Sequence, residues 1–351
     1  MDLNVALQRH VNIVHDHEAF WNQQGRYDIV HLHFPEYMTF ETEQALRGSL
    51  TRKLMSAVEE RLQYWSGRSK LVITRHVLLP HGARSDPRWE RMYEMVYRYV
   101  DGVVHFADPS VEDFERRYAN TRFVHGVPLH AVVPHHNYAS LPNTISREQA
   151  RRALRIPDRA KVLLVFGAIR SEEERQMVLD AFHDARLPHK LLLVSRWREK
   201  LADVSWIRLK YWLRDLKRLY YRVHPRYHFN YEFVAEENAQ TYLNAADVLL
   251  IPRLHVLNSG NITLGMTFGR VVIGPDSLDV GDLLRSTGNV VFDPNHPESA
   301  AAAVEQAFAL AARNEVGPAN MKLALGEWSA EQCADRYFEF FEKLNGMRKT
   351  A

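Results

Sequence analysis

Residues 247–275 read DVLLIPRLHVLNSGNITLGMTFGRVVIGP, and this stretch contains two apolar segments separated by a helical one. The first segment, 248–251, is apolar and ends at a proline, which is typical of a buried strand of a parallel sheet. A small polar turn follows, and we expect a helix to begin at Ser259-Gly260 and to end at Gly269. The second apolar segment, 270–273, then completes a strand–helix–strand unit. This order predicts a parallel α/β sheet.

The same alternation continues through most of the chain. We expect strands in the first half at residues 27–31, 70–74, 102–105 and 131–133, and in the second half at 161–166, 190–195, 228–231, 248–251, 270–273 and 289–292. No strand is expected before residue 27, which indicates either a truncated start or a reduced first sheet. A turn signal and an N-cap expected at Ser146 predict the domain boundary at 145/146. The helical pattern that begins at Ser329 makes residues 329–351 a terminal helix, expected to pack back on the first domain.

Length and composition exclude several classes of protein. A chain of 351 residues exceeds what one core usually serves, and 46% hydrophobic with 25% charged residues is typical of a globular protein. No apolar run approaches the ~20 residues that span a bilayer, and no signal-peptide pattern begins the chain. We therefore expect a cytoplasmic protein. The single cysteine, Cys333, excludes an intrachain disulfide and a cysteine-based zinc cluster.

Basic and aromatic residues gather between Arg196 and Arg226, although the chain carries 45 basic against 43 acidic residues. A solvated helix face explains this composition, and so does an amphipathic helix that binds an anionic membrane surface. A nucleic-acid or membrane-surface binding protein is the alternative function of a different class. The net charge of +2 is near neutral, and no recognised nucleic-acid-binding motif is present. We therefore expect that the protein does not bind nucleic acid.

Candidate anion-binding residues follow two strands of the second half. Gly167 makes a turn after one strand, and Arg170 lies just beyond it, where a guanidinium could bind a diphosphate. The alternative for Arg170 is a surface ion pair with Glu173 or Glu174. At the helix that follows the other strand, backbone N–H groups and the positive dipole end would bind the same anion. The residues expected there are Asn258, Ser259, Gly260 and Asn261.

Candidate proton acceptors follow two strands of the first half. His33 and Glu36 come after one strand and His76 after the next, at the carboxyl ends where open α/β sheets bind ligands. Glu36 could act as a general base, and His76 is expected beside His33 with the same chemistry available. The alternatives are that Glu36 caps a helix, that His76 binds loop backbone and that His31 is a core histidine with a satisfied hydrogen bond.

Four segments carry a resemblance to a known family. They are YDIVHLHFPEYM (27–38), TRHVLLPHGARSDPRWER (74–91), VFGAIR (165–170) and LNSGNITLGMTFGRVVIGP (257–275). Together they resemble the bacterial exopolysaccharide glycosyltransferases of GT-B fold, in particular the xanthan-type β-mannosyltransferase and, more distantly, family 4 glycosyltransferases. The resemblance covers most of the chain from Tyr27 onward.

The resemblance implies two Rossmann-like domains that face each other across a cleft, with residues 1–145 binding the acceptor and 146–328 the nucleotide-sugar donor. It implies an inverting transfer without a metal or other cofactor, from a nucleotide sugar, with GDP-mannose the first choice, to a lipid-linked oligosaccharide. A UDP-sugar donor with another acceptor is the alternative. Arg253 and the loop at Phe233-Val234 are expected near the nucleoside.

Two departures from family 4 bear on the mechanism. That family places a Glu-x7-Glu pair around the helix near 260, and the matching positions here are Val256 and Leu264. This loss favours the inverting mechanism. The family also usually follows its Gly-Arg turn with a phosphate-binding lysine, and that position is Glu173. Without that lysine, Arg170 would have to neutralise more of the negative charge of the diphosphate. The departure also leaves the identity of the donor open.

Overall fold

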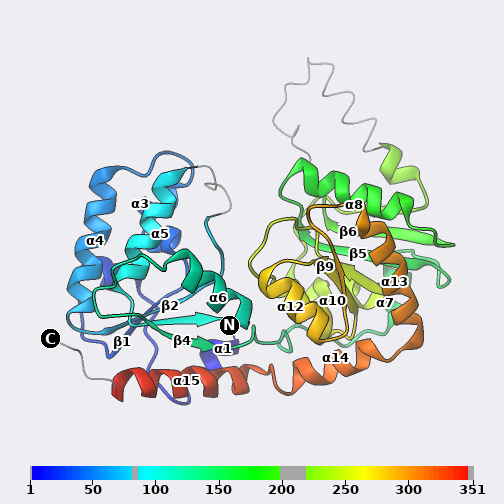
Figure 1. The fold of residues 1–351 in the computed structure, drawn as a ribbon. Helices are drawn as coiled ribbons and strands as arrows, with labels where there is room; N and C mark the ends of the chain where they lie inside the picture. Colours follow the sequence, from blue (N-terminus) through cyan, green and yellow to red (C-terminus); the bar gives the residue numbers. More distant parts are fainter. Residues whose placement is uncertain (1, 81–85, 198–218, 347–351) are drawn as a thin grey trace. The chain divides into compact units, whose positions relative to one another are not determined.

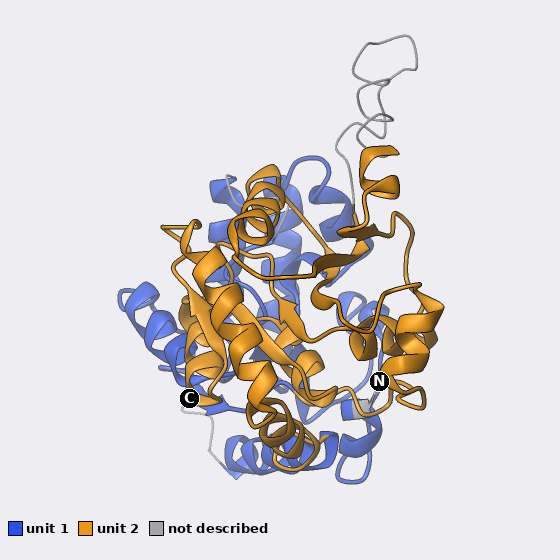
Figure 2. Ribbon diagram, turned by 90° about the vertical axis from the view of Figure 1, so that its right-hand side faces the viewer, with its two compact units in different colours: residues 1–135, 330–351 blue, residues 136–329 orange. Residues whose placement is uncertain are grey.

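The protein divides into two compact units (Figure 2). The computed structural model describes residues 2–80, 86–197 and 219–346. The first unit contains residues 1–135 together with 330–351, and the second contains 136–329. The division at 135/136 lies somewhat before the 145/146 boundary expected from the sequence. Each unit is built on one parallel sheet (Figure 1).

The first unit has a four-stranded sheet in the order β1-β2-β3-β4. Its strands are β1 (Ile29–Leu32), β2 (Lys70–Thr74), β3 (Gly102–His105) and β4 (Leu129–Val132). The helical elements are α1 (Asp2–Leu7), α2 (His17–Trp21), η1 (Pro35–Tyr37), α3 (Phe40–Ala45), α4 (Arg52–Ser66), α5 (Pro87–Tyr99), α6 (Asp108–Arg117) and α15 (Ala330–Gly346). Each strand pairs with the next along the chain, so their carboxyl ends form one edge in sequence order.

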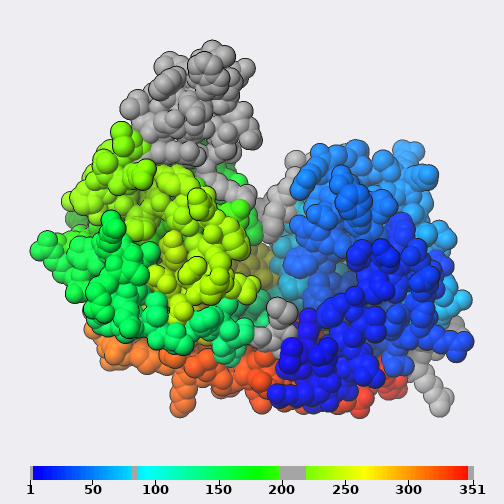
Figure 3. Space-filling view, turned by 180° about the vertical axis from the view of Figure 1, so that it is seen from behind, coloured from blue at the N-terminus to red at the C-terminus, as the bar shows by residue number. Residues whose placement is uncertain are grey.

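Alternate residues of these strands enter two different cores. Leu71 and Ile73 of β2 face the core that α4 and α5 complete. Val72, between them, faces the core formed with α1 and α15. The terminal helix therefore packs on the first sheet, as the sequence predicted (Figure 1). The first residues of the chain (dark blue in Figure 3) lie against the C-terminal segment (red).

Gly102 allows α15 to approach the sheet closely. A Cβ atom at this position would lie 2.7 Å from Cζ of Phe340 and 2.9 Å from Cδ1 of Leu344. A larger side chain would have to displace the side chains of Phe340 and Leu344. The glycine at the start of β3 thus leaves the space that the Phe340 and Leu344 side chains of α15 occupy.

The second unit has a six-stranded parallel sheet in the order β10-β9-β8-β5-β6-β7. Its strands are β5 (Lys161–Ala168), β6 (Lys190–Arg196), β7 (Tyr227–Phe229), β8 (Val248–Leu250), β9 (Val271–Pro275) and β10 (Val290–Phe292). The helices are α7 (Arg147–Ala153), α8 (Glu172–Asp184), α10 (Glu236–Ala245), α11 (Gly260–Thr267), α12 (Leu278–Ser286), α13 (Ser299–Arg313) and α14 (Val316–Leu325). All ten expected strands are present in the two sheets, with ends shifted by up to two residues.

The direction of strand order reverses between β5 and β8. From β5 the chain builds outward through β6 and β7, then returns to β8 and builds the other way. In open α/β sheets, ligands bind outside the carboxyl ends of the strands at such a switch point. The topology therefore predicts a ligand site at the segments that follow β5 and β8.

Candidate functional site

The switch point brings together the two predicted anion-binding segments. Leu163 of β5 pairs with Val248 of β8, so the carboxyl ends of the two strands are neighbours. The chain leaves β5 toward Arg170 and leaves β8 toward the start of α11. A side-chain contact joins the segments directly, because Asn261 Nδ2 donates a hydrogen bond of 2.9 Å to the carbonyl of Phe166.

Gly167 sits in the irregular end of β5. Its φ of +88° is in the left-handed region that favours glycine. The register of β5 with β6 shifts between Val165 and Ala168, and the Gly167 N–H donates 2.8 Å to Oγ of the buried Ser195. Apart from Gly167 and its two neighbours in the chain, no described atom lies within 4 Å of the place that a Cβ would occupy. The backbone here is therefore fixed on one side and open on the other.

The start of α11 has the features of an anion site. Ser259 is the N-cap with extended backbone, and its side chain makes no capping hydrogen bond. The first turn of such a helix has backbone N–H groups that lack helical acceptors, together with the positive end of the dipole. Gly265 lets the helix pack tightly, because a Cβ there would lie 2.7 Å from Cγ2 of Val272. Gly269 ends the segment with φ +65°, as the sequence predicted.

Arg253 is held by the last residue of β5 and the first turn of α8. Its Nη1 lies 3.0 Å from Oε2 of Glu174, and its Nη2 donates 2.8 Å to the carbonyl of Ala168. The same carboxylate oxygen accepts the backbone N–H of Arg170 at 2.8 Å, whereas the Arg170 side chain is exposed. Arg253 thus braces the Arg170 turn. The sequence did not single out Glu174 for this contact; its place in the acidic first turn of α8 was the available signal.

Phe233 and Val234 lie between β7 and α10, at the same edge of the second sheet. The Phe233 side chain is 73% exposed, and the guanidinium of Arg196 lies 5.7 Å from its ring centre. Val234 is half-buried against the core. An exposed ring beside a cation is a surface on which a nucleobase could stack.

In the first unit, His33 and His76 form a hydrogen-bonded pair, called here the histidine pair. The shared bond joins Nδ1 of His33 and Nε2 of His76 over 2.9 Å. Leu32, the last residue of β1, is the register partner of Ile73, the residue before the end of β2, so the segments that follow the two strands are neighbours. Phe34 stacks on His76 with ring centres 4.3 Å apart, and His33 remains exposed.

Both histidines of the pair have lowered pKa values, which favours their neutral forms near pH 7. Desolvation, then the charges of His33 and His135, lower the pKa of His76 to about 3. Desolvation and the nearby His15 also lower the pKa of His33. In a neutral pair, one imidazole donates the shared hydrogen and the other accepts it. Of the two remaining ring nitrogens, one therefore carries a lone pair and the other an N–H.

Glu36 is enclosed within the first unit, whereas it was expected beside His33 at the ligand-binding ends of the strands. The 3-10 turn η1, which begins at Pro35, directs the carboxylate toward α5, where Tyr93 Oη donates a hydrogen bond of 2.6 Å to Oε2. Glu36 is 4% exposed. Desolvation raises its pKa, although the hydrogen bond from Tyr93 opposes the rise. The carboxylate is thus a stronger base than usual but is covered in this conformation.

Comparison with solved structures identifies the architecture. Sucrose-phosphate synthase from Thermosynechococcus elongatus matches with a TM-score of 0.63 and 17% identity, over 93% of this chain and 76% of that one. Alr3699/HepE from Anabaena in complex with UDP-glucose matches with a TM-score of 0.64 and 13% identity, over 97% and 82%. A glycosyltransferase from Rickettsia africae matches with 0.63 and 12%, over 99% and 82%.

The chain has the GT-B fold. No protein-family model matches the sequence, and no curated protein matches it. At these identities the likeness extends to the fold, and the activity has to be argued from the site. The GT-B architecture predicted from the sequence is confirmed.

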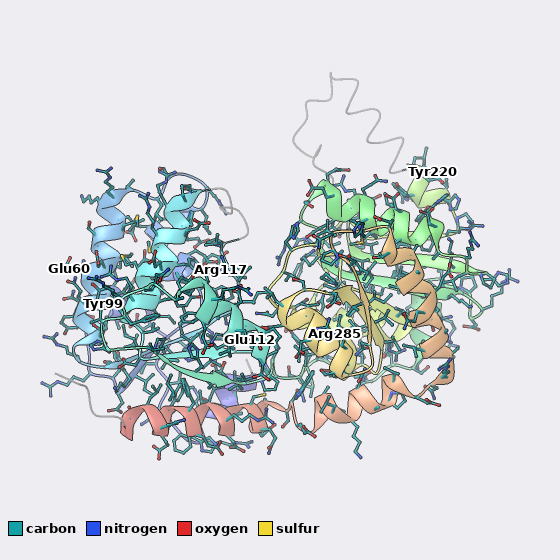
Figure 4. The ribbon with its side chains drawn as sticks, in the orientation of Figure 1. Glu60, Tyr99, Glu112, Arg117, Tyr220 and Arg285 are labelled. Carbon is teal, nitrogen blue, oxygen red and sulfur yellow. The ribbon has the colours of Figure 1, made fainter. Side chains whose placement is uncertain are left out.

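Most of the basic stretch between Arg196 and Arg226 lies outside the described residues, at 198–218. Of its described members, Trp197 is buried and stacks on Phe229 with ring centres 4.3 Å apart, so it belongs to the core of this GT-B unit. Tyr220 lies on the surface (Figure 4). No helix in the described ranges is long and apolar enough to cross a membrane.

Buried charges in the first unit were missed by sequence reasoning. Arg75, next to His76, is 1% exposed and pairs with Asp113 at 2.6 Å and with the carbonyl of Ser110 at 2.7 Å. It holds α6 against the end of β2. Asp113 lies far along the chain, and nothing in the local sequence links it to Arg75. Within the described residues, no group of three or more His, Cys, Asp or Glu side chains is arranged to hold a metal ion.

Proposed function

We propose that this chain is a nucleotide-sugar-dependent glycosyltransferase whose second unit binds the donor. The observation that carries the proposal is the meeting, at the switch point of the second sheet, of the Gly167 turn with the start of α11. An open backbone, a helix N-terminus and an exposed arginine together suit a diphosphate. The GT-B fold and the complex of HepE with UDP-glucose support this choice.

The diphosphate would accept hydrogen bonds from backbone N–H groups at Ser259, Gly260 and Asn261. Arg170, whose turn is braced by the Glu174–Arg253 ion pair, would meet its remaining charge. These groups stabilise negative charge as it develops on the leaving diphosphate, so no metal is required by the proposal. Phe233 and Val234 would border the nucleoside.

The transfer is proposed to be inverting, because the carboxylate pair of the retaining family 4 enzymes is replaced by Val256 and Leu264. A base must then take the proton of the acceptor hydroxyl. The sequence favours Glu36, whose raised pKa strengthens it as a base but whose burial requires η1 to open. The histidine pair has a lone pair available and an exposed member, so it is the second candidate.

GDP-mannose is the proposed donor and a lipid-linked oligosaccharide in exopolysaccharide or surface glycan synthesis the proposed acceptor, on the strength of the sequence resemblance. A UDP-sugar is the second candidate donor, and it is favoured by the match to HepE bound to UDP-glucose. Attachment of residues 196–226 to an anionic membrane face remains a proposal, since most of that segment lies outside the described residues.

A thermal-shift panel of GDP, UDP, ADP and dTDP with the whole chain tests the proposal. A nucleotide that binds the folded state stabilises it by mass action, by about 2.7 kcal/mol at a hundred times its Kd. We expect one nucleotide to raise the melting temperature, and Arg170→Ala to reduce that rise. The absence of any shift at millimolar concentration would overturn the donor site.

A further inference from the structure

We infer that Tyr337 positions the histidine pair through Thr74 and His31. The inference rests on the proposed function only for its catalytic consequence. Its physical content is a chain of contacts within the first unit, and this can be measured without turnover.

The series of contacts begins at Tyr337, on the C-terminal helix α15. Tyr337 Oη lies 3.1 Å from Thr74 Oγ1, and Thr74 Oγ1 lies 2.8 Å from His31 Nε2. Thr74 is the last residue of β2, and His31 lies in β1, next to it in the sheet. A residue more than 250 positions away in the sequence thus enters the sheet end from which His33 and His76 project.

The burial of Tyr337 fixes the direction of each hydrogen bond. Tyr337 is 3% exposed, and Thr74 is the one hydrogen-bond partner that the structure records for its hydroxyl among the described residues. A buried hydroxyl hydrogen needs an acceptor, so Tyr337 donates to Thr74. Thr74 then directs its own hydrogen to Nε2 of His31. The neutral His31 must consequently carry its proton on Nδ1.

His31 supports the histidine pair by ring contact. Its ring centre lies 4.4 Å from that of His33, and on the α15 side it lies 5.7 Å from Tyr337 and 5.8 Å from Phe341. The ring of His33 therefore packs on the ring of His31, which in turn contacts Tyr337 and Phe341 of α15. The orientation of the shared bond between the pair depends on that support.

The hydrogen bond from Thr74 also decides where a proton can be held. It occupies Nε2 of His31, the nitrogen that would take a second proton, and burial together with the charges of His33 and His76 lowers the pKa of His31 further. The other titratable groups acting on this cluster are His15, beside His33, and His135, beside His76. A proton taken up from an acceptor hydroxyl therefore stays on the histidine pair and does not pass inward to His31.

Two matched pairs of variants test the inference by NMR of ¹⁵N-labelled histidine, whose ring nitrogens report tautomer and hydrogen bonding. Thr74→Val removes the hydroxyl, and Thr74→Ser keeps it. Tyr337→Phe removes the donor on α15, and Tyr118→Phe is the control at another buried tyrosine of the same unit. Single replacements of His31, His33 and His76 by Gln assign the signals.

In the wild type we expect His31 with a bare, hydrogen-bonded Nε2. Thr74→Val should shift the signals of His31 and of both members of the pair, and Tyr337→Phe should mix the His31 tautomers, whereas Thr74→Ser and Tyr118→Phe should keep the wild-type pattern. If Thr74→Val moves His31 alone and leaves the pair unchanged, the inference is overturned. If Thr74→Val does not fold, an unchanged His31 spectrum in Tyr337→Phe overturns it equally.

Turnover gives an independent readout. If the histidine pair is the base, Tyr337→Phe should lower kcat, measured with the donor identified by thermal shift, by about tenfold, part of the ~10²–10⁴ that a general base contributes, with the donor KM unchanged. NMR shifts without any turnover in the wild type would sink the proposed function and leave the positioning intact. Normal turnover in Tyr337→Phe despite NMR shifts would show that the pair is not the base.

Discussion

Arg253 Nη1 lies 3.0 Å from Oε2 of Glu174, and each side chain is 11% exposed. The ion pair joins the segment after β8 to the first turn of α8. Since Glu174 also binds the backbone N–H of Arg170, one carboxylate fixes the positions of both arginines that the sequence analysis selected. The donor-site geometry thus depends on an acidic residue, which a diphosphate would not contact favourably by itself.

Replacement of Glu174 by Gln should therefore weaken both folding and donor binding. Removing one partner of a largely buried pair leaves the other charge uncompensated, which typically costs about 3 kcal/mol or more. We expect a fall of that order in the free energy of unfolding, measured by urea denaturation. The matched variant Glu173→Gln changes the same charge one residue earlier, at an exposed position, and should stay within about 0.5 kcal/mol of wild type. Equal stability of both variants would contradict the bracing role.

Arg170→Ala should weaken donor binding by about tenfold or more, because charge-assisted contacts to phosphate are the strong ones. Calorimetric titration of the nucleotide found by thermal shift provides the measurement. Arg313→Ala, at the exposed end of α13, removes the same charge elsewhere in the unit and serves as the control. An unchanged affinity in Arg170→Ala would remove this residue from the donor site.

The sequence predicted the fold well because its signals are local. Apolar segments such as 70–74 and 102–105 begin and end in the structure where their composition indicates, and Gly269 ends its helix as expected. The residues that cover a buried side chain could not be predicted, because they come from segments distant in the sequence. Glu36 was expected at a strand end that binds ligands, and no local pattern reveals that its carboxylate accepts a hydrogen bond from Tyr93 on α5.

The same distinction applies to histidines. A core histidine with a satisfied hydrogen bond was one interpretation of His31, and the half-buried ring does have a hydrogen-bond partner in Thr74. The further link from Thr74 to Tyr337 joins residues 263 positions apart in the sequence, and the packing of α15 on the sheet brings it about. The sequence thus predicted which polar residues lie at the strand ends. It could not predict the hydrogen bonds that orient their side chains.

Acid should destabilise the first unit through its buried histidines. His105 is fully buried between Ser110 and His130, and desolvation, then the charges of His130 and Arg75, lower its pKa to about 2. The unfolded chain binds a proton at the ordinary pKa of 6.5 and the folded chain does not. Stability is therefore unaffected above pH 6.5 and falls below it, by about 1.4 kcal/mol per pH unit for each such histidine.

Urea denaturation between pH 7.5 and pH 5 measures this slope. His105→Gln removes one titrating group and should make the curve shallower below pH 6.5, with its loss of hydrogen bonds visible as a constant offset. A slope identical to that of the wild type would show that His105 does not stay neutral in the folded protein.

The last prediction separates the two candidate bases. Glu36→Gln keeps the shape of the side chain and can still accept a hydrogen bond from Tyr93, so the fold should be retained. Loss of a general base costs ~10²–10⁴ in rate and leaves binding largely intact. If Glu36 is the base, Glu36→Gln should lose turnover by that order with donor affinity within a few-fold of wild type. His76→Ala should then retain more of the rate. Near-normal turnover in Glu36→Gln, beside an inactive His76→Ala that still binds donor, would transfer the role to the histidine pair.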